Sequence, residues 1–368
     1  MPRKKYLDIV NELEARIRHG DYALTRLPAE RQLAKEFGVC HNTARKAVMA
    51  LIEHGLLTRN PENHRGVLNR HTGRRKIPLQ IALASFWFSS GDMGRWVQGL
   101  SRFAKTHGGM LRPVYYTHWN DPLLKDALRG FDVVFIYPLQ EVPKAVGERL
   151  RHAAAAVALI GGDYTQAGFT SLRLAPVRSS LALLLEQLHQ QGHRRVDAFC
   201  PDPHPAKTEQ MVYGAEEARR LGMQWRSWVS EPRPTIEFDS KLGAMVLLRQ
   251  WLELPAAERG TALLVTSMPP AIAIMRGLAD AGLRPGRDVA LCVVDGEGEN
   301  RWQVPTVTAT EPALTDATIT ACVDWLLAHR GQHGKPRLFE PPDVGLFVGE
   351  STGGPVSLVK RETGGHTR

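Results

Sequence analysis

The sequence predicts an α/β protein in which an N-terminal winged helix-turn-helix, residues 1–70, precedes a two-lobed, doubly wound α/β domain, residues 79–352. The first 76 residues hold 16 Lys and Arg against 8 Asp and Glu, a net charge of +8, whereas the other 292 hold 31 against 30. This basic arm follows helical periodicity, and beyond it strand-like runs alternate with helical ones. A basic arm on a neutral body is typical of a protein that binds a polyanion, although a solvated basic tail would give the same charge.

The basic arm has the pattern of three short helices followed by a two-stranded wing. Apolar residues four positions apart define the first helix, a Pro at a helix-start position opens the second, and Gly38 supplies the turn before the third. A basic turn, residues 60–65, joins the two short strands of the wing. The predicted elements are a helix through Ile9, Leu13 and Ile17, a helix from Leu27 to Phe37, a helix from about His41 to His54, and strands at 55–59 and 66–68.

The third helix has two unlike faces. Ala44, Val48 and Leu51 form an apolar face that is expected to point into the core. The opposite face carries short polar and cationic groups, which suit base edges and phosphates in a DNA groove. Its members are His41, Asn42, Thr43, Arg45 and Lys46.

The arm resembles the GntR family of bacterial regulators. The resemblance is carried by G-D-Y-A-L-T-R-L-P-A-E-R-Q-L-A-K-E-F-G-V and T-A-R-K-A-V-M-A-L-I-E-H-G-L-L, and it covers residues 6–70. It implies that Arg31, Arg45 and the wing tip at Gly66, with the neighbouring Arg65, contact double-stranded DNA, and that Asn42 and Thr43 begin the recognition helix. Arg31 could instead pair with a neighbouring carboxylate, His41 could be exposed without touching a base, and Thr43 could contact only a phosphate.

Two positions depart from the GntR pattern, which often has Ser then Arg where this chain has Cys40 and His41. Loss of the Ser weakens the expected helix N-cap, and His in place of Arg removes a bidentate guanine reader. The DNA sequence that this chain recognises is therefore expected to differ from that of better-known members.

The larger region alternates β-rich runs with amphipathic stretches of helical length, which favours parallel sheets covered by helices on both faces. About 275 residues fit two doubly wound lobes better than one, with a ligand cleft between them. The predicted strands are 79–85, 111–116, 133–137, 156–160, 195–200, 262–266 and 289–294, and the predicted helices are 179–191, 209–221, 243–252, 270–281 and 314–329.

From residue 176 on, this region resembles the effector domain of LacI/GalR regulators, which is itself periplasmic-binding-protein-like. The clearest carriers are V-R-S-S-L-A-L-L-L-E-Q-L-H-Q-Q-G-H-R-R-V and T-A-L-L-V-T-S-M-P-P-A-I-A-I-M-R-G-L-A-D-A-G-L-R-P-G-R-D-V-A-L-C-V-V-D-G. The predicted boundaries are a linker at 71–78, a first lobe at about 79–175 and 305–335, a second lobe at about 176–304 and 336–352, and a flexible tail at 353–368.

A small-molecule effector, with a sugar or sugar derivative as the class that the resemblance implies, would bind between the lobes. Aromatic faces stack on sugar rings and carboxylates accept from hydroxyl groups. Phe86 and Trp87 follow the first strand, Asp163 follows the fourth, and Asp295 ends a buried strand where the LacI family carries a ligand-binding aspartate. Trp87 could instead be a lobe-edge residue and Asp295 could cap the next turn. Trp302 could line the cleft or pack a loop.

Two further candidate positions depart from the LacI pattern. Met211 stands where that family usually has Arg, and Ser267-Met268 stand where it usually has Asn-Asp. Both changes remove hydrogen-bonding groups that a polyol needs. We therefore expect a less polar ligand, a differently oriented one, or none.

The sequence as a whole predicts a cytoplasmic, homodimeric transcriptional regulator, by default a ligand-responsive repressor on a pseudo-palindromic DNA operator. The alternative is a regulator whose larger domain has lost small-molecule binding and serves dimerisation or a partner. An enzyme is not expected because the chain lacks G-x-S-x-G, H-E-x-x-H and P-loop motifs. The four cysteines form no C-x-x-C pair, and no signal peptide, membrane span, metal or cofactor is expected.

Overall fold

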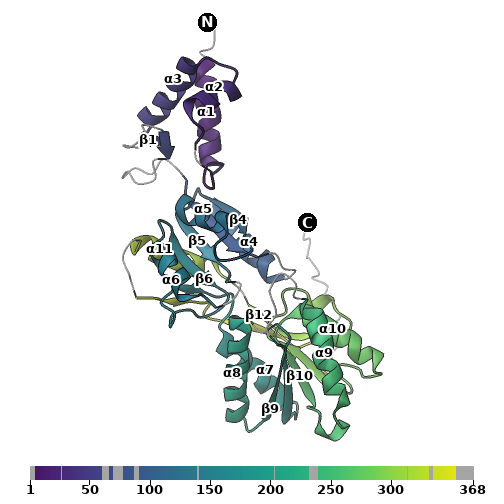
Figure 1. Cartoon of the computed structure of the whole chain (residues 1–368). Coiled ribbons are helices and arrows are strands. Elements are labelled where there is room, and N and C mark those ends of the chain that lie inside the picture. Colours follow the sequence, from purple (N-terminus) through teal and green to yellow (C-terminus); the bar gives the residue numbers. More distant parts are fainter. Residues whose placement is uncertain are drawn as a thin grey trace, which may run out of the picture.

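A computed structural model describes residues 5–25, 27–59, 66–68, 78–86, 91–138, 141–202, 204–231, 239–312, 314–330 and 335–353. Within these ranges the winged helix-turn-helix lies at one end of the molecule, beyond the first of two α/β lobes, and the second lobe lies at the other end (Figure 1). The predicted fold class is confirmed. Most of the linker and the tail lie outside the described residues.

The N-terminal module packs three helices around a core of its own. Leu13, Leu33, Ala44 and Leu51 are fully buried there, so the apolar face predicted for the third helix points inward. The elements are α1 (Lys5–Arg18), α2 (Glu30–Glu36), α3 (His41–Glu53), β1 (Leu57–Arg59) and β2 (Gly66–Leu68), and the last two pair antiparallel as the wing.

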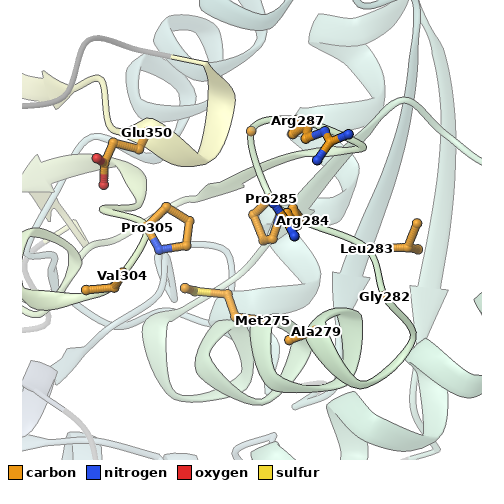
Figure 2. A pocket seen from close by; sticks show the side chains of 11 residues that line it. Met275, Ala279, Gly282, Leu283, Arg284, Pro285, Arg287, Val304, Pro305 and Glu350 are labelled. Atoms are coloured by element: carbon orange, nitrogen blue, oxygen red, sulfur yellow. The ribbon is translucent and has the colours of Figure 1, made fainter.

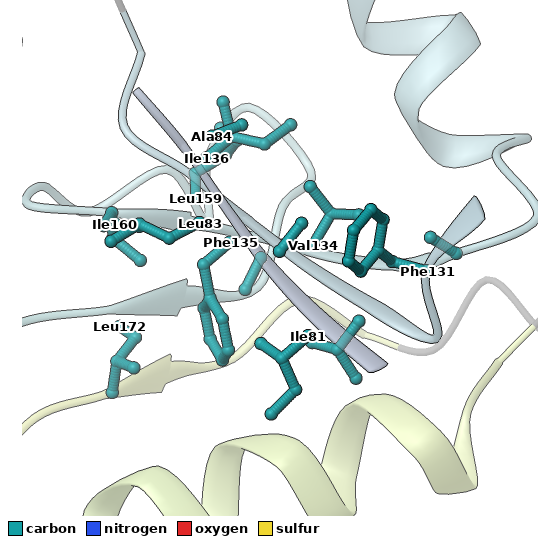
Figure 3. Close-up of a cluster of buried hydrophobic side chains, with 14 of the residues drawn as sticks. Ile81, Leu83, Ala84, Phe131, Val134, Phe135, Ile136, Leu159, Ile160 and Leu172 are labelled. Carbon is teal, nitrogen blue, oxygen red and sulfur yellow. The ribbon is translucent and has the colours of Figure 1, made fainter. Parts of the chain in front are cut away.

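The first lobe is built on a six-stranded parallel sheet of order β13-β7-β6-β5-β3-β4. Its central strands are buried on both faces, as expected for strands covered by helices on either side. Figure 3 shows Ile81 and Phe135 on the side of the sheet that faces α11. The elements are β3 (Gln80–Ser85), α4 (Gly91–Thr106), β4 (Met110–Tyr115), α5 (Pro122–Gly130), β5 (Val133–Ile136), α6 (Lys144–Arg151), β6 (Ala156–Ile160), β7 (Ser171–Leu172), α11 (Asp316–Ala328) and β13 (Leu338–Phe339).

The second lobe has a six-stranded sheet of order β14-β12-β11-β10-β8-β9, in which β14 alone is antiparallel to its neighbour. Alternate residues of β10 face opposite sides: Leu264 packs with α7 and α8, and Leu263 with α9 and α10. The elements are α7 (Val177–Gln190), β8 (Arg195–Cys200), α8 (Pro205–Arg220), β9 (Gln224–Val229), α9 (Ser240–Glu253), β10 (Ala262–Val265), α10 (Met268–Asp280), β11 (Ala290–Val293), β12 (Thr308–Pro312) and β14 (Val344–Phe347).

The chain crosses between the lobes at places that differ from those expected. We expected residues 305–335 in the first lobe and 336–352 in the second, but β12 pairs within the second sheet and β13 within the first. These two strands were missed because β13 has only two residues and β12, with the sequence T-A-T-E-P, has no run of large apolar residues. The helices α4, α5 and α6 and the strand β9 were also not anticipated.

The loop after α1 contributes residues to the hydrophobic cores of both the N-terminal module and the first lobe. Tyr22 belongs to the core of the N-terminal module, whereas the next residue, Ala23, is buried in the core of the first lobe. Arg112 Nη1 on β4 donates to the backbone oxygen of Gly20 at 3.1 Å. A Cβ at Gly130 would overlap the backbone oxygen of Ala23, so only glycine permits this close approach. The N-terminal module is thus docked on the first lobe as well as tethered by the linker.

Candidate functional site

The start of the recognition helix α3 bears out the expected weakening of its N-cap. Cys40 occupies the N-cap position with extended backbone and makes no capping hydrogen bond through its side chain. Its Sγ instead lies 3.1 Å from Thr43 Oγ1. The hydrogen bond with the Thr43 side chain lowers the pKa of the Cys40 thiol, which is exposed. Asp, Ser or Thr at this position would satisfy a free backbone N–H of the first turn, and Cys does not.

The candidate DNA-binding side chains form an exposed surface at the beginning of α3. Four residues of α3 and one of α2 are exposed there, namely His41, Asn42, Arg45, Lys46 and Arg31, while Thr43 and Gly66 are half-buried. His41 Nε2 lies 3.4 Å from Glu30 Oε2. Within the described residues Arg31 forms no ion pair, and Arg65 lies outside them. This surface presents donors and cations toward solvent from a rigid helix, as base and phosphate recognition require.

A second candidate site lies between the two lobes. It is a cavity of about 50 Å³, with walls supplied by α4 and the residues after β5, β6 and β7 of the first lobe, and by α7, α8 and the residues after β11 of the second. The lining is partly polar and partly apolar, and its polar members include Asp92, Arg173, Lys207, Gln210 and Asp295. A cavity of this size holds only a water or two, so the lobes are closed on each other.

Ion pairs cross the cleft and hold the lobes together. Arg95 on α4 pairs with Asp92 on its own helix and, through Nη2, with Asp295 Oδ2 of the second lobe at 2.5 Å. Arg173, at the end of β7, pairs with Glu209 on α8. The pKa of Asp295 is raised by burial and by the neighbouring Asp92, which oppose the effect of Arg95.

Glu297 bridges the N-termini of one helix from each lobe. Its Oε2 accepts a hydrogen bond from the Gly91 N–H at the start of α4 (2.6 Å), and its Oε1 accepts from the Met268 N–H at the start of α10 (3.3 Å). Helix N-termini stabilise a carboxylate in this position. The backbone of Glu297 has φ of 50°, which is uncommon for a residue with a side chain and marks a candidate functional position.

Lys207 lines the cavity from α8, and His204 lies just before that helix. The His204 ring stacks on Tyr137 of the first lobe, and its Nε2 lies 2.7 Å from Pro138 O. Burial lowers the pKa of His204 to about 4, so the ring is neutral and donates to that carbonyl. Lys207 Nζ donates to Thr266 O at 3.3 Å. Burial opposes its charge, but the carboxylates of Asp92, Glu297, Asp295 and Asp202 raise its pKa.

Replacing His204 by Gln is expected to remove part of the acid sensitivity of the protein. Because the pKa of His204 is about 4 in the folded chain against 6.5 ordinarily, the unfolded chain binds more protons between these values. The contribution of neutral His204 to the free energy of unfolding is therefore fully present above pH 6.5. As the pH falls toward 4 this contribution is lost, by roughly 3 kcal/mol in total. Denaturant unfolding at a series of pH values measures the free energy of unfolding of the wild type and of the His204→Gln variant. The same dependence of this free energy on pH in both proteins would contradict the prediction.

Two of the ligand-binding residues expected from the sequence lie beside the cleft. Asp295 lines the cavity and pairs across it with Arg95. Ser267 is buried at the N-cap position of α10, and its side chain makes no capping hydrogen bond. The next residue, Met268, donates its N–H to Glu297.

The other expected ligand residues lie elsewhere. Phe86 is buried in the first-lobe core against Tyr137, and Met211 is buried in the second-lobe core. Asp163 is exposed and accepts hydrogen bonds from Thr165. Trp87 lies outside the described residues. Trp302 is 79% exposed, so it neither lines the cleft nor packs against a loop.

Several polar residues of the cleft were not found from the sequence. Arg95 lies on α4, whose glycine-containing start obscured the helical pattern. Lys207 and Gln210 precede Met211 on α8. If the segment K-T-E-Q-M had been treated as one turn of a helix, it could have indicated that these polar residues take the place of the arginine that the LacI pattern has at position 211. The cleft lining includes charged side chains as well as apolar ones, and the expectation of a less polar ligand, a differently oriented one, or none stays a prediction.

A larger hollow lies on the outer side of the second lobe. It measures about 570 Å³ and is lined by the end of α10, by residues 282–287 and by Val304, Pro305 and Glu350. Figure 2 shows Val304, Pro305 and Glu350 on one side of the view and Leu283 on the other. Val304 is 93% exposed, and Trp302, two residues before it, is exposed as well. We call these two side chains the lobe-2 apolar surface.

Comparison with known proteins supports the two domains. Residues 5–66 match the family of bacterial regulatory proteins described as gntR, and residues 185–352 match the periplasmic binding protein-like domain. No curated protein matches the chain. The first match and the exposed recognition helix define the chain as a DNA-binding transcriptional regulator. Its N-terminal domain is of the gntR type, and its larger domain has the fold found in LacI-family regulators.

Solved structures support the fold of the larger domain. A LacI family transcriptional regulator from Mycobacterium smegmatis is 15% identical, with a TM-score of 0.61 over 74% of this chain and 98% of that one. One from Bifidobacterium animalis subsp. lactis is 16% identical, with a TM-score of 0.60 over 76% and 98%. The lac repressor dimer bound to operator and the anti-inducer ONPF is 18% identical, with a TM-score of 0.60 over 76% and 95%. In the described part of the chain, no helix is long and apolar enough to cross a membrane.

Proposed function

We propose that this regulator is a ligand-responsive repressor that binds a pseudo-palindromic operator as a homodimer in the cytoplasm. The observation that carries the proposal is the surface at the start of α3, where Asn42, Arg45 and Lys46 are all exposed on one rigid helix. The +8 charge of residues 1–76 supplies the electrostatic attraction to DNA phosphates. Asn and Arg side chains at such a helix start are those that read base edges in the major groove.

A homodimer is supported by the lobe-2 apolar surface. Trp302 and Val304 expose large apolar side chains beside a hollow that is itself partly apolar. Exposed apolar patches on soluble proteins commonly mark contacts with another chain, and a second copy would bury both sides of a symmetric interface. The lac repressor structure, whose fold this domain shares, is a dimer bound to operator.

A small-molecule effector is supported by the closure of the two lobes on a cavity whose lining includes charged side chains. Arg95 and Asp295 belong to different lobes, so their pairing depends on the angle between the lobes. Because the N-terminal module docks on the first lobe through Ala23, a change in that angle would move the DNA-binding surfaces of a dimer relative to each other. The effector shifts the equilibrium between two interlobe angles only to the extent that it binds one of them more tightly than the other.

The experiment that tests the proposal selects DNA duplexes from a random library with the full-length protein. The expected result is enrichment of an inverted repeat whose half-sites are separated by one helical turn or a multiple. A chain that lacks residues 1–76 is expected to keep a cooperative unfolding transition and to lose all specific binding. Specific binding by the shortened chain would contradict the domain assignment.

A second candidate function is a regulator whose larger domain serves dimerisation without binding a small molecule. The cleft favours it in one respect, since about 50 Å³ leaves no room for an effector unless the lobes open. Such a regulator would bind its operator equally well with and without added small molecules.

A further inference from the structure

Two carboxylates of the interlobe cleft, one from each lobe, share a single guanidinium. Arg95 pairs with Asp92 on its own helix and with Asp295 of the second lobe. The side chains of Asp92 and Asp295 are only 14% and 13% exposed. Carboxylates this far from water need a cationic partner, and the cationic group of a ligand could take the place that Arg95 holds.

A second observation also points to a ligand that donates hydrogen bonds. Gln210 is more than nine-tenths buried and lines the cavity, and its Oε1 has no hydrogen-bond donor among the described residues. A buried amide oxygen without a donor is destabilising by about 1–3 kcal/mol. An N–H group of a ligand in the cavity would satisfy it.

The guanidinium of Arg95 occupies the place that a ligand cation would take. It lies between Asp92 and Asp295, and its side chain is 23% exposed, more than the side chains of either carboxylate partner (14% and 13%). Arg95 is therefore at the mouth of the cleft, where its long side chain is able to swing into water.

A ligand would displace Glu297 less readily than Arg95. Its carboxylate accepts from the N-termini of two helices, and its residue is 7% exposed with its backbone held at positive φ. A cationic effector has only to replace the more exposed Arg95, while Glu297 stays in place. The exposure of Arg95 thus favours a cation between Asp92 and Asp295.

We infer that the effector is a small organic cation, bearing a guanidinium or amine group, that binds Asp92 and Asp295 in place of Arg95. Arg95 acts as an internal competitor that keeps the lobes closed until the effector displaces it. The inference rests on the proposed function, because it names the ligand class of the same cleft. The carboxylate pair supplies charge-assisted hydrogen bonds, and Gln210 Oε1 accepts from a further N–H of the ligand.

Agmatine, which carries a guanidinium and an amine, is the probe, and N-butylurea is its uncharged counterpart. Isothermal titration at fixed ionic strength compares the full-length wild type with Arg95→Ala. Removal of the internal competitor is expected to tighten agmatine binding by about tenfold or more, and Asp295→Asn in the Arg95→Ala background is expected to weaken it by a similar factor. N-butylurea is expected to bind none of these proteins.

Arg102→Ala is the matched control, since Arg102 lies on the same helix but is exposed and pairs with Asp316 outside the cleft. It is expected to bind agmatine as the wild type does. If Arg95→Ala does not fold, Arg95→Gln takes its place, because it keeps a polar side chain of similar reach. Thermal unfolding and operator affinity verify that each variant is folded.

Equal agmatine affinity in the wild type and the Arg95 variant would overturn the inference. So would no binding to either protein in the millimolar range, or binding that Asp295→Asn leaves unchanged. Operator affinity is measured on the same preparations. If the wild type binds its operator but no cation, only this inference fails; if it binds no operator, the proposed function fails.

Discussion

Replacing Asp197 by alanine is expected to lower the free energy of unfolding of the second lobe by about 3–5 kcal/mol. Asp197 lies on β8 and is 1% exposed. Its carboxylate accepts from Arg226 Nε at 2.6 Å, Trp251 Nε1 at 2.7 Å and the Gly260 N–H at 2.5 Å. Burial by itself would raise its pKa, but these donors together lower it, which means that the charged form is stabilised in the fold.

The alanine variant leaves three donors without their acceptor, and Arg226 loses its ion-pair partner. Denaturant unfolding monitored by Trp fluorescence measures the loss. Asp280→Ala is the matched control, since Asp280 forms an exposed pair with Arg276 one helix turn away. That change is expected to cost no more than about 0.5 kcal/mol. Similar losses in the two variants would mean that Asp197 does not organise the lobe.

Replacing Arg45 by alanine is expected to weaken specific operator binding by about 1–3 kcal/mol, roughly 5- to 150-fold in Kd. Arg45 is exposed on the second turn of α3, between the buried Ala44 and Ala47. Its backbone is held by the helix while its guanidinium is free to reach base edges. The measurement is fluorescence anisotropy with the selected operator at one salt concentration, because DNA affinity depends steeply on salt.

Arg18→Ala is the control for Arg45, since it removes the same charge from the end of α1, where Arg18 pairs with Glu14. A general electrostatic effect would weaken binding to all DNA sequences equally in both variants. A base contact would instead reduce the preference of the Arg45 variant for operator over random DNA. Equal losses in the two variants would assign Arg45 a phosphate-binding role without sequence readout.

The strands that the sequence predicted are those with strong local signals. The runs 156–160 and 195–200 are continuous and β-rich between helical stretches, and β6 and β8 coincide with them. The strands β12 and β13 lack such a signal, because β12 has no run of large apolar residues and β13 has only two residues. Local periodicity therefore predicted the central strands and missed the places where the chain crosses between lobes.

The cleft was predictable only in part for a related reason. Asp295 could be placed because it directly follows a buried strand, and strand ends meet at the cleft. Arg95 and Lys207 are about 110 residues apart and lie on helices of different lobes, so no local spacing connects them. Met211 was placed correctly on a helix, but the side of that helix that faces the cleft depends on how α8 packs.

By itself the sequence determined the N-terminal winged helix-turn-helix, the position of its recognition helix and the doubly wound class of the larger domain. These features follow from local periodicity, turn residues and charge, which adjacent residues encode. Only the tertiary structure decided that the N-terminal module docks through Ala23 and that Arg95, Asp295 and Glu297 close the cleft. The physical reason is that burial and ion pairing join residues from separate elements, and their free energies depend on packing that no single segment specifies.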